Sequence, residues 1–102
     1  MKKLLIAAII SLSSVTTAAV AEVKVGIILG FTGPIESLTP AMRDGARMAF
    51  DEASNSGNLL GGETFTILEA DSTCVDSAAA TAAAEQLVAD GVAAIMGADS
   101  VS

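Results

Sequence analysis

The chain has 102 residues and a formal net charge of −7, from 12 acidic and 5 basic side chains, and it contains no histidine. An acidic surface repels phosphate groups, which argues against nucleic acid and anionic membrane surfaces as partners. Without histidine, the Ser-His and Cys-His nucleophile pairs and most catalytic zinc sites cannot be built from this segment. We therefore expect no metal site and no cofactor.

The first 21 residues have the pattern of a cleavable export signal. Lysines at positions 2 and 3 precede an apolar run over residues 4–12, and residues 19–21 read Ala-Val-Ala, a small-x-small cleavage pattern. The run is shorter than the roughly 20 residues that a membrane-spanning helix needs, which favours a signal over an anchor. We expect a signal peptide over residues 1–21, a mature exported chain from Glu22, and no direct membrane insertion after cleavage. Loss of the two lysines would take the net charge from −7 to −9.

The mature segment begins with a strand, a loop and a helix. Residues 23–29 are rich in β-branched side chains and carry one charge, as in a strand buried on both faces. Residues 30–39 follow as a loop. We predict a helix from Thr39, as the N-cap, to about Ser54, because Pro40 at the first helical position has no N–H to lose.

The spacing of residues predicts two faces for this helix. One apolar stripe is expected to face the sheet: Met42, Ala46, Ala49, Phe50 and Ala53. The charged residues are expected to form a solvated face with a weak Arg47–Asp51 ion pair: Arg43, Asp44, Arg47, Asp51 and Glu52.

The second half of the chain repeats the strand and helix pattern. A turn region over residues 55–62 precedes a predicted strand at 64–70, and residues 92–96 form a third apolar run. Between these strands, Asp76 is predicted to cap an alanine-rich helix that ends at Gly91 in a left-handed conformation. The inward stripe of this helix is expected to be Ala80, Ala83, Ala84, Leu87 and Val88.

The order of elements predicts an α/β fold, the first βαβαβ of a doubly wound parallel sheet with right-handed crossovers. Because a parallel strand is covered on both faces and paired at its edges, we expect a chain that stops just after such a strand to be truncated. In strand order 2-1-3, the loops at 30–39 and 97–102 would border one crevice. Hydroxyls and backbone N–H groups there would face a carboxylate-bearing ligand.

Two other interpretations of the loops remain open on residue types alone. The loop at 30–39 fits an ordinary turn as well as a binding loop. In addition, Gly30 and Gly33 after one strand, with Glu69 and Asp71 ending the next, imitate a dinucleotide fingerprint. The glycine pattern is incomplete, however, and the helix starts too late for its N-terminus to hold a pyrophosphate.

Asp71 and Cys74 have structural interpretations beside functional ones. We predict that Asp71 orders the turn before Asp76 through a side-chain-to-backbone hydrogen bond, rather than reaching a cleft. Cys74 is the single cysteine of the sequence. In an exported chain, an odd cysteine either pairs with a cysteine outside the segment or stays a buried thiol.

From Val23 to about Gly97 the chain resembles the amino-terminal part of the periplasmic leucine/isoleucine/valine-binding proteins. These are the type I solute receptors of ATP-binding-cassette (ABC) importers. The matching pieces, in order, are residues 24–26 (Lys-Val-Gly), 32–34 (Thr-Gly-Pro), 44–49 (Asp-Gly-Ala-Arg-Met-Ala), 61–62 (Gly-Gly), 71–74 (Asp-Ser-Thr-Cys) and 92–97.

The resemblance implies that residues 22–102 are the amino-terminal part of the first lobe of a two-lobed receptor, not an enzyme. Such a receptor closes on an amino acid or a related small amide or acid and then docks on a membrane permease. The loop beginning with Thr32 and Gly33 would line the cleft, and Leu38 would pack against the ligand side chain. Ser100 and Ser102 would offer hydroxyls to the ligand α-carboxylate.

The resemblance also bears on the end of the chain. Relatives commonly read Gly-x-x-Ser-Ser-Gly or Gly-x-x-Cys-Ser-Gly after the third strand, and residues 100–102 (Ser-Val-Ser) depart from both patterns. Cys74 matches a cysteine that in relatives often pairs with one where this chain has Ser100, so its disulfide partner is absent here. A periplasmic sensor of the same fold, and an α/β enzyme using Glu69 and Asp71, are the alternative functions.

Overall fold

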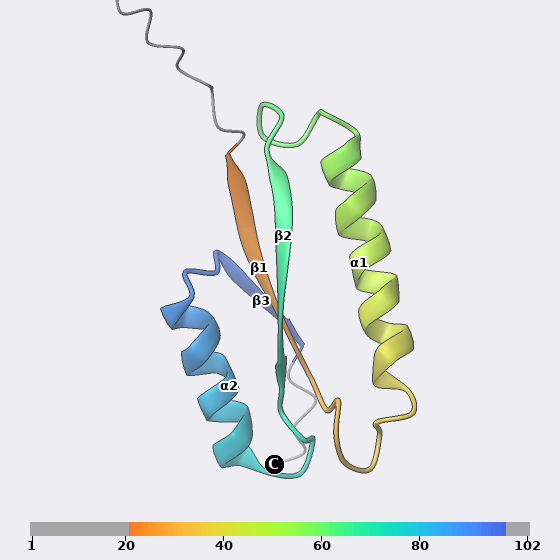
Figure 1. The fold of residues 1–102 in the computed structure, drawn as a ribbon, viewed down its shortest axis with the longest axis vertical. Coiled ribbons are helices and arrows are strands. Elements are labelled where there is room, and N and C mark those ends of the chain that lie inside the picture. Colours follow the sequence, from red (N-terminus) through yellow and green to blue (C-terminus); the bar gives the residue numbers. More distant parts are fainter. Residues whose placement is uncertain (1–20, 98–102) are drawn as a thin grey trace, which may run out of the picture.

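The computed structural model describes residues 21–97, and its elements alternate as the sequence predicts (Figure 1). The predicted signal peptide therefore lies almost wholly outside the described residues. In chain order the elements are β1 (Glu22–Leu29), α1 (Thr39–Asn55), β2 (Thr64–Asp71), α2 (Ser77–Ala89) and β3 (Ala94–Gly97).

The three strands form one parallel sheet in the order β2-β1-β3. Leu29 at the end of β1 pairs with Asp71 at the end of β2, and Ile28 pairs with Gly97 at the end of β3. After β1, the chain adds β2 on one side of that strand. After β2, it crosses over β1 and adds β3 on the other side. Right-handed crossovers in opposite directions place the helices on opposite faces of the sheet, as Figure 1 shows. The βαβαβ prediction and the 2-1-3 order are confirmed.

The buried core is centred on β1. Val25, Ile27, Ile28 and Leu29 are all at most 5% exposed. Successive side chains of a strand point to opposite faces, so this run can be buried only if both faces are covered. Helices α1 and α2 provide that cover, which confirms that β1 is buried on both faces.

Helix α2 packs closely on the sheet through small residues and one leucine. Leu87 is 1% exposed and packs with Ala83 and Ile28. A methyl group added at Gly26 would lie 2.6 Å from Leu87 Cδ1, so a larger residue there would force the leucine side chain to shift. The partly buried neighbours of this cluster are Leu68, Ala70, Ala84 and Val92. Val88, predicted to face inward, is 67% exposed, so the inward stripe ends at Leu87.

Both predicted ends of α2 are confirmed. The Asp76 carboxylate accepts hydrogen bonds from the N–H groups of Ala78 at 2.8 Å and Ala79 at 3.2 Å. Gly91 has a φ of +82°, the left-handed conformation that ends many helices. These local signals place the helix without any reference to the rest of the chain.

The predicted faces of α1 are partly wrong. Phe50 packs edge-to-face on Phe65 of β2, with ring centroids 4.8 Å apart, and Ala46 and Ala53 are half-buried as expected. Met42, however, is 51% exposed, and Ala49 is exposed too. The arginines that were expected in solvent lie toward β2, because a carboxylate on that strand attracts them and their long stems can cover apolar surface.

The start of α1 also differs from the prediction. Leu38, not Thr39, occupies the N-cap position, and it makes no side-chain capping bond. Thr39 is the first helical residue and is fully buried, and its hydroxyl donates to the carbonyl oxygen of Gly30 at 3.1 Å. The threonine therefore ties the helix start to the end of β1 instead of capping the helix.

We expect Leu87→Ala to lower the free energy of unfolding by about 2–4 kcal/mol, because it leaves a cavity between α2 and the sheet. The neighbouring change Val88→Ala removes an exposed side chain and should cost less than about 0.5 kcal/mol. Urea denaturation followed by circular dichroism measures both. Equal losses for the two variants would contradict the packing of α2 described above.

Candidate functional site

The candidate site lies at the edge of the sheet where the carboxyl ends of the strands meet. Two loops leave this edge: the β1–α1 loop, residues 30–38, and the β2–α2 loop, residues 72–76. Strand β1 has β2 on one side and β3 on the other, so the direction of winding reverses at its carboxyl end. Ligands of open α/β sheets bind at this kind of switch point.

The two loops lie directly against each other, and glycines make this close approach possible. Gly33 has a φ of +105°, and a methyl group added there would lie 2.6 Å from the carbonyl oxygen of Thr73. A methyl group added at Gly30 would lie 2.8 Å from Cβ of Cys74. Any larger residue at either position would push the loops apart.

The Asp71 carboxylate joins the two loops. Its Oδ2 accepts a hydrogen bond of 2.6 Å from the Thr32 hydroxyl, and its Oδ1 accepts one of 3.3 Å from the Thr32 N–H. The same Oδ1 accepts a bond of 2.9 Å from the N–H of Thr73. The predicted side-chain-to-backbone bond that orders the turn is therefore confirmed. The sequence did not predict the second half of the arrangement, in which Asp71 also holds Thr32.

These contacts determine the ionisation of Asp71. Desolvation acts to raise the pKa of its carboxyl, but the hydrogen bond from the Thr32 hydroxyl and those from the N–H groups of Thr73, Thr32 and Phe31 outweigh it. The net result is a pKa below the ordinary value of an aspartate. Asp71 is thus a negatively charged acceptor at neutral pH.

The turn after Asp71 has an unusual backbone. Thr73 and Cys74 have φ values of +59° and +69°, and a β-branched residue rarely adopts the left-handed region. Fully buried Ser72 supports the turn, because its hydroxyl oxygen accepts from the Cys74 N–H at 3.3 Å and its own N–H donates to Leu29. Strained backbone of this kind is concentrated at functional sites. The sequence carried no signal for it.

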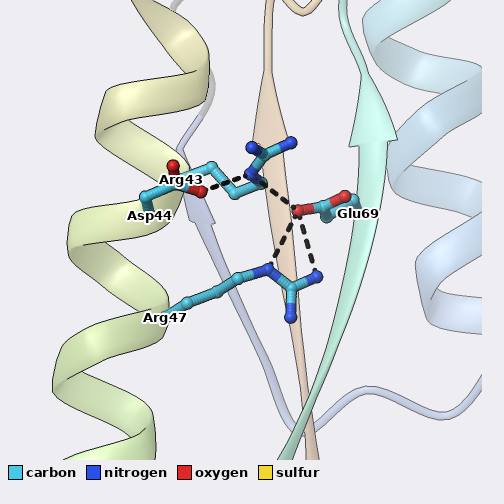
Figure 2. Close-up of polar contacts among 4 residues, drawn as sticks. All are labelled: Arg43, Asp44, Arg47 and Glu69. Carbon is cyan, nitrogen blue, oxygen red and sulfur yellow. Dashed lines mark hydrogen bonds and ion pairs between the residues drawn. The ribbon is translucent and has the colours of Figure 1, made fainter.

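A group of charged residues braces the β1–α1 loop from the side of α1. Figure 2 shows Arg43 and Arg47 of α1 converging on Glu69 of β2. Arg47 Nη2 lies 3.1 Å and Arg43 Nε 3.5 Å from Glu69 Oε1, and Arg43 Nε also bonds Asp44 at 2.9 Å. In addition, the Arg43 guanidinium lies 6.0 Å from the ring centroid of Phe31 in the loop. The predicted Arg47–Asp51 pair is replaced by the bond to Glu69.

Some of the predicted ligand-binding residues lie within the described part of the chain, and the others do not. Thr32, Gly33 and Leu38 are exposed on the β1–α1 loop, Leu38 to 61%. Ser100 and Ser102 lie outside the described residues. Cys74 is buried in the turn, and its disulfide stays a prediction.

Residues 21–97 do not form a closed chamber at the candidate site. No pocket is enclosed among them, and no three of their Asp, Glu or Cys side chains gather as a metal site would require. Neither helix in the described part of the chain is both long and apolar enough to cross a bilayer.

A doubly wound sheet whose loops meet at its switch point defines a ligand-binding type of α/β protein. Comparison with known families narrows this class. The periplasmic binding protein family matches residues 22–102, and the chain belongs to this family. The resemblance noted from the sequence is therefore confirmed.

One curated relative is the Leu/Ile/Val-binding protein BraC3 of Rhizobium johnstonii. It is 29% identical to this chain over 77 residues. The match covers 76% of this chain and 20% of the relative, so the chain spans about a fifth of the relative's length.

We expect Gly33→Ala to destabilise the chain by about 2–4 kcal/mol, because it adds a steric clash with Thr73 to the cost of a left-handed alanine. Gly57→Ala is the matched control. Gly57 has a φ of +70° but no neighbouring atom within 4 Å of an added methyl group. The control should therefore show only the backbone cost, about 1–2 kcal/mol. Thermal unfolding of both variants measures the difference, and equal costs would refute the close approach of the loops.

The stability that Asp71 contributes should depend on pH. Its carboxyl has a lowered pKa in the folded chain and a pKa of about 3.9 in the unfolded chain, so the unfolded chain takes up a proton first as the pH falls. The contribution is complete at neutral pH and is lost as the pH drops from about 4 through the folded pKa. Urea midpoints of wild type and Asp71→Asn should therefore converge in acid. A difference that is constant down to pH 2.5 would contradict the assignment.

Proposed function

We propose that this chain forms part of one lobe of an extracytoplasmic solute receptor that serves an ABC importer. The main support is the pair of joined loops at the switch point of β1, in a chain of the periplasmic binding protein family. The expected ligands are branched-chain amino acids or related small amides and acids. The printed name of the relative, a Leu/Ile/Val-binding protein, supports this ligand class.

The β1–α1 loop is proposed to line the ligand cleft with Thr32, Gly33 and Leu38. Leu38 presents an exposed apolar side chain at the carboxyl edge of the sheet, and such a side chain suits an aliphatic ligand. Ser100 and Ser102 are proposed to bind the ligand carboxylate through hydrogen bonds to a charged group, each contributing about 1.5–3 kcal/mol. These assignments make the cleft apolar on one side and polar on the other.

The carboxylates of Glu69 and Asp71 motivated the enzyme alternative, but the partners that they have in the structure fit a receptor role. Glu69 is paired with Arg43 and Arg47, and Asp71 accepts bonds from Thr32 and Thr73. Both carboxylates are thus engaged by partners within the chain, which favours a structural role for them over a catalytic one. The export pattern of residues 1–21 supports a periplasmic location, and a membrane permease is the proposed partner.

The test of the proposal is calorimetry with leucine, isoleucine and valine. Closure of two lobes supplies the desolvation that tight binding needs. Residues 22–102 alone should therefore give no heat of binding, whereas a two-lobed receptor that carries this chain should bind at least one of the three. Saturable heat from the isolated chain would contradict the need for a second lobe. A two-lobed receptor that binds none of the three amino acids would refute the proposed ligand class.

A further inference from the structure

Asp71 uses both carboxylate oxygens to connect loops that lie far apart in sequence. Thr32 and Asp71 are 39 residues apart, whereas Thr73 is two residues from Asp71. Oδ2 accepts from the Thr32 hydroxyl, and Oδ1 accepts from the two backbone N–H groups of Thr32 and Thr73. One side chain therefore sets the position of the β1–α1 loop relative to the turn after β2.

The hydroxyl of Thr32 is committed by this contact. A threonine hydroxyl has one proton and two lone pairs, and at 2.6 Å that proton is donated to Asp71. A ligand carboxylate is purely an acceptor, so it can gain no hydrogen bond from this hydroxyl. Thr32 thus lies in the proposed cleft wall while its hydroxyl and its backbone N–H both donate to Asp71.

Other contacts fix the two ends of the loop and the turn within it. The Phe31 N–H donates to Leu29 at 2.9 Å, and the buried Thr39 hydroxyl donates to Gly30. Within the loop, the N–H groups of Glu36 and Leu38 donate to carbonyl groups of the loop itself. The bonds from Thr32 to Asp71 hold this turn, and with it Leu38, against the neighbouring loop.

We propose that Asp71 is a positioning residue for ligand binding, and that Thr32 acts through Asp71 rather than by donating a hydrogen bond to the ligand. The pair holds the β1–α1 loop in its binding shape before a ligand arrives, so the ordering cost is not incurred during binding. This inference rests on the proposed receptor function, since it assigns roles within that site. Its first test, however, needs no ligand.

The first test is amide hydrogen exchange across residues 31–38 of the chain. Asp71→Ala should increase exchange of these amides at least about tenfold relative to the amides of β1, since the hydrogen bonds to a charged acceptor are lost. Asp76→Ala is the matched control, because it removes another carboxylate that accepts two N–H groups but does not contact this loop. Equal protection of these amides in wild type and Asp71→Ala would overturn the proposal. An equal loss of protection in Asp71→Ala and Asp76→Ala would overturn it too.

The second test measures the Kd for L-leucine in a two-lobed receptor that carries this chain. Thr32→Ser keeps the hydroxyl and should bind like wild type, whereas Thr32→Val and Asp71→Ala should each raise the Kd about tenfold. The double variant should be no weaker than Asp71→Ala, because both changes remove the same interaction. The proposal would be overturned if the increases in Kd of the two single variants multiplied in the double variant. It would also be overturned if Thr32→Ser bound L-leucine as weakly as Thr32→Val.

The two tests separate this inference from the proposed function. If the wild-type receptor does not bind leucine, isoleucine or valine, the proposed ligand class fails, and the exchange experiment still decides whether Asp71 orders the loop. If the receptor binds and the exchange pattern does not change, the positioning role fails and the receptor function stands.

Discussion

Burial of β1 on both faces is the constraint on which the rest of this structure depends. Val25, Ile27, Ile28 and Leu29 are almost fully buried, so both faces of the strand need a cover and both edges need a partner. A chain with right-handed crossovers meets this requirement by placing β2 and β3 on opposite sides of β1 and the helices on opposite faces. The carboxyl end of β1 thereby becomes the switch point, and the loops that follow the strands come together there.

At the switch point, close backbone approach and one carboxylate determine the geometry. Gly33 allows the β1–α1 loop to lie against Thr73, and Asp71 then reaches both loops with short hydrogen bonds. The strained turn at Thr73 and Cys74 persists because buried Ser72 and the end of β1 support it from beneath. A rigid surface of this kind suits a receptor wall, since a preformed loop loses little entropy when it meets a ligand.

Electrostatics explains why the inward face of α1 is not the most apolar one. Glu69 lies on a strand that α1 covers, and a half-buried carboxylate without a partner would be costly. Arg43 and Arg47 supply that partner and turn the helix so that Met42 and Ala49 face outward. Helical periodicity placed Ala46, Phe50 and Ala53 on the inward face correctly, but it carries no information about the charge on the strand beneath the helix.

The amino-acid sequence by itself determined the elements, their order and both ends of α2, because these depend on residues within one or two turns of each other. The buried run of β1, the Asp76 cap and the left-handed Gly91 are local in this sense, and so is the Asp71 bond to Thr73. Only the tertiary structure decided that Asp71 also holds Thr32, and that Arg47 bonds Glu69 rather than Asp51. These partners are 39 and 22 residues apart, and packing alone, which no local pattern encodes, selects such pairs.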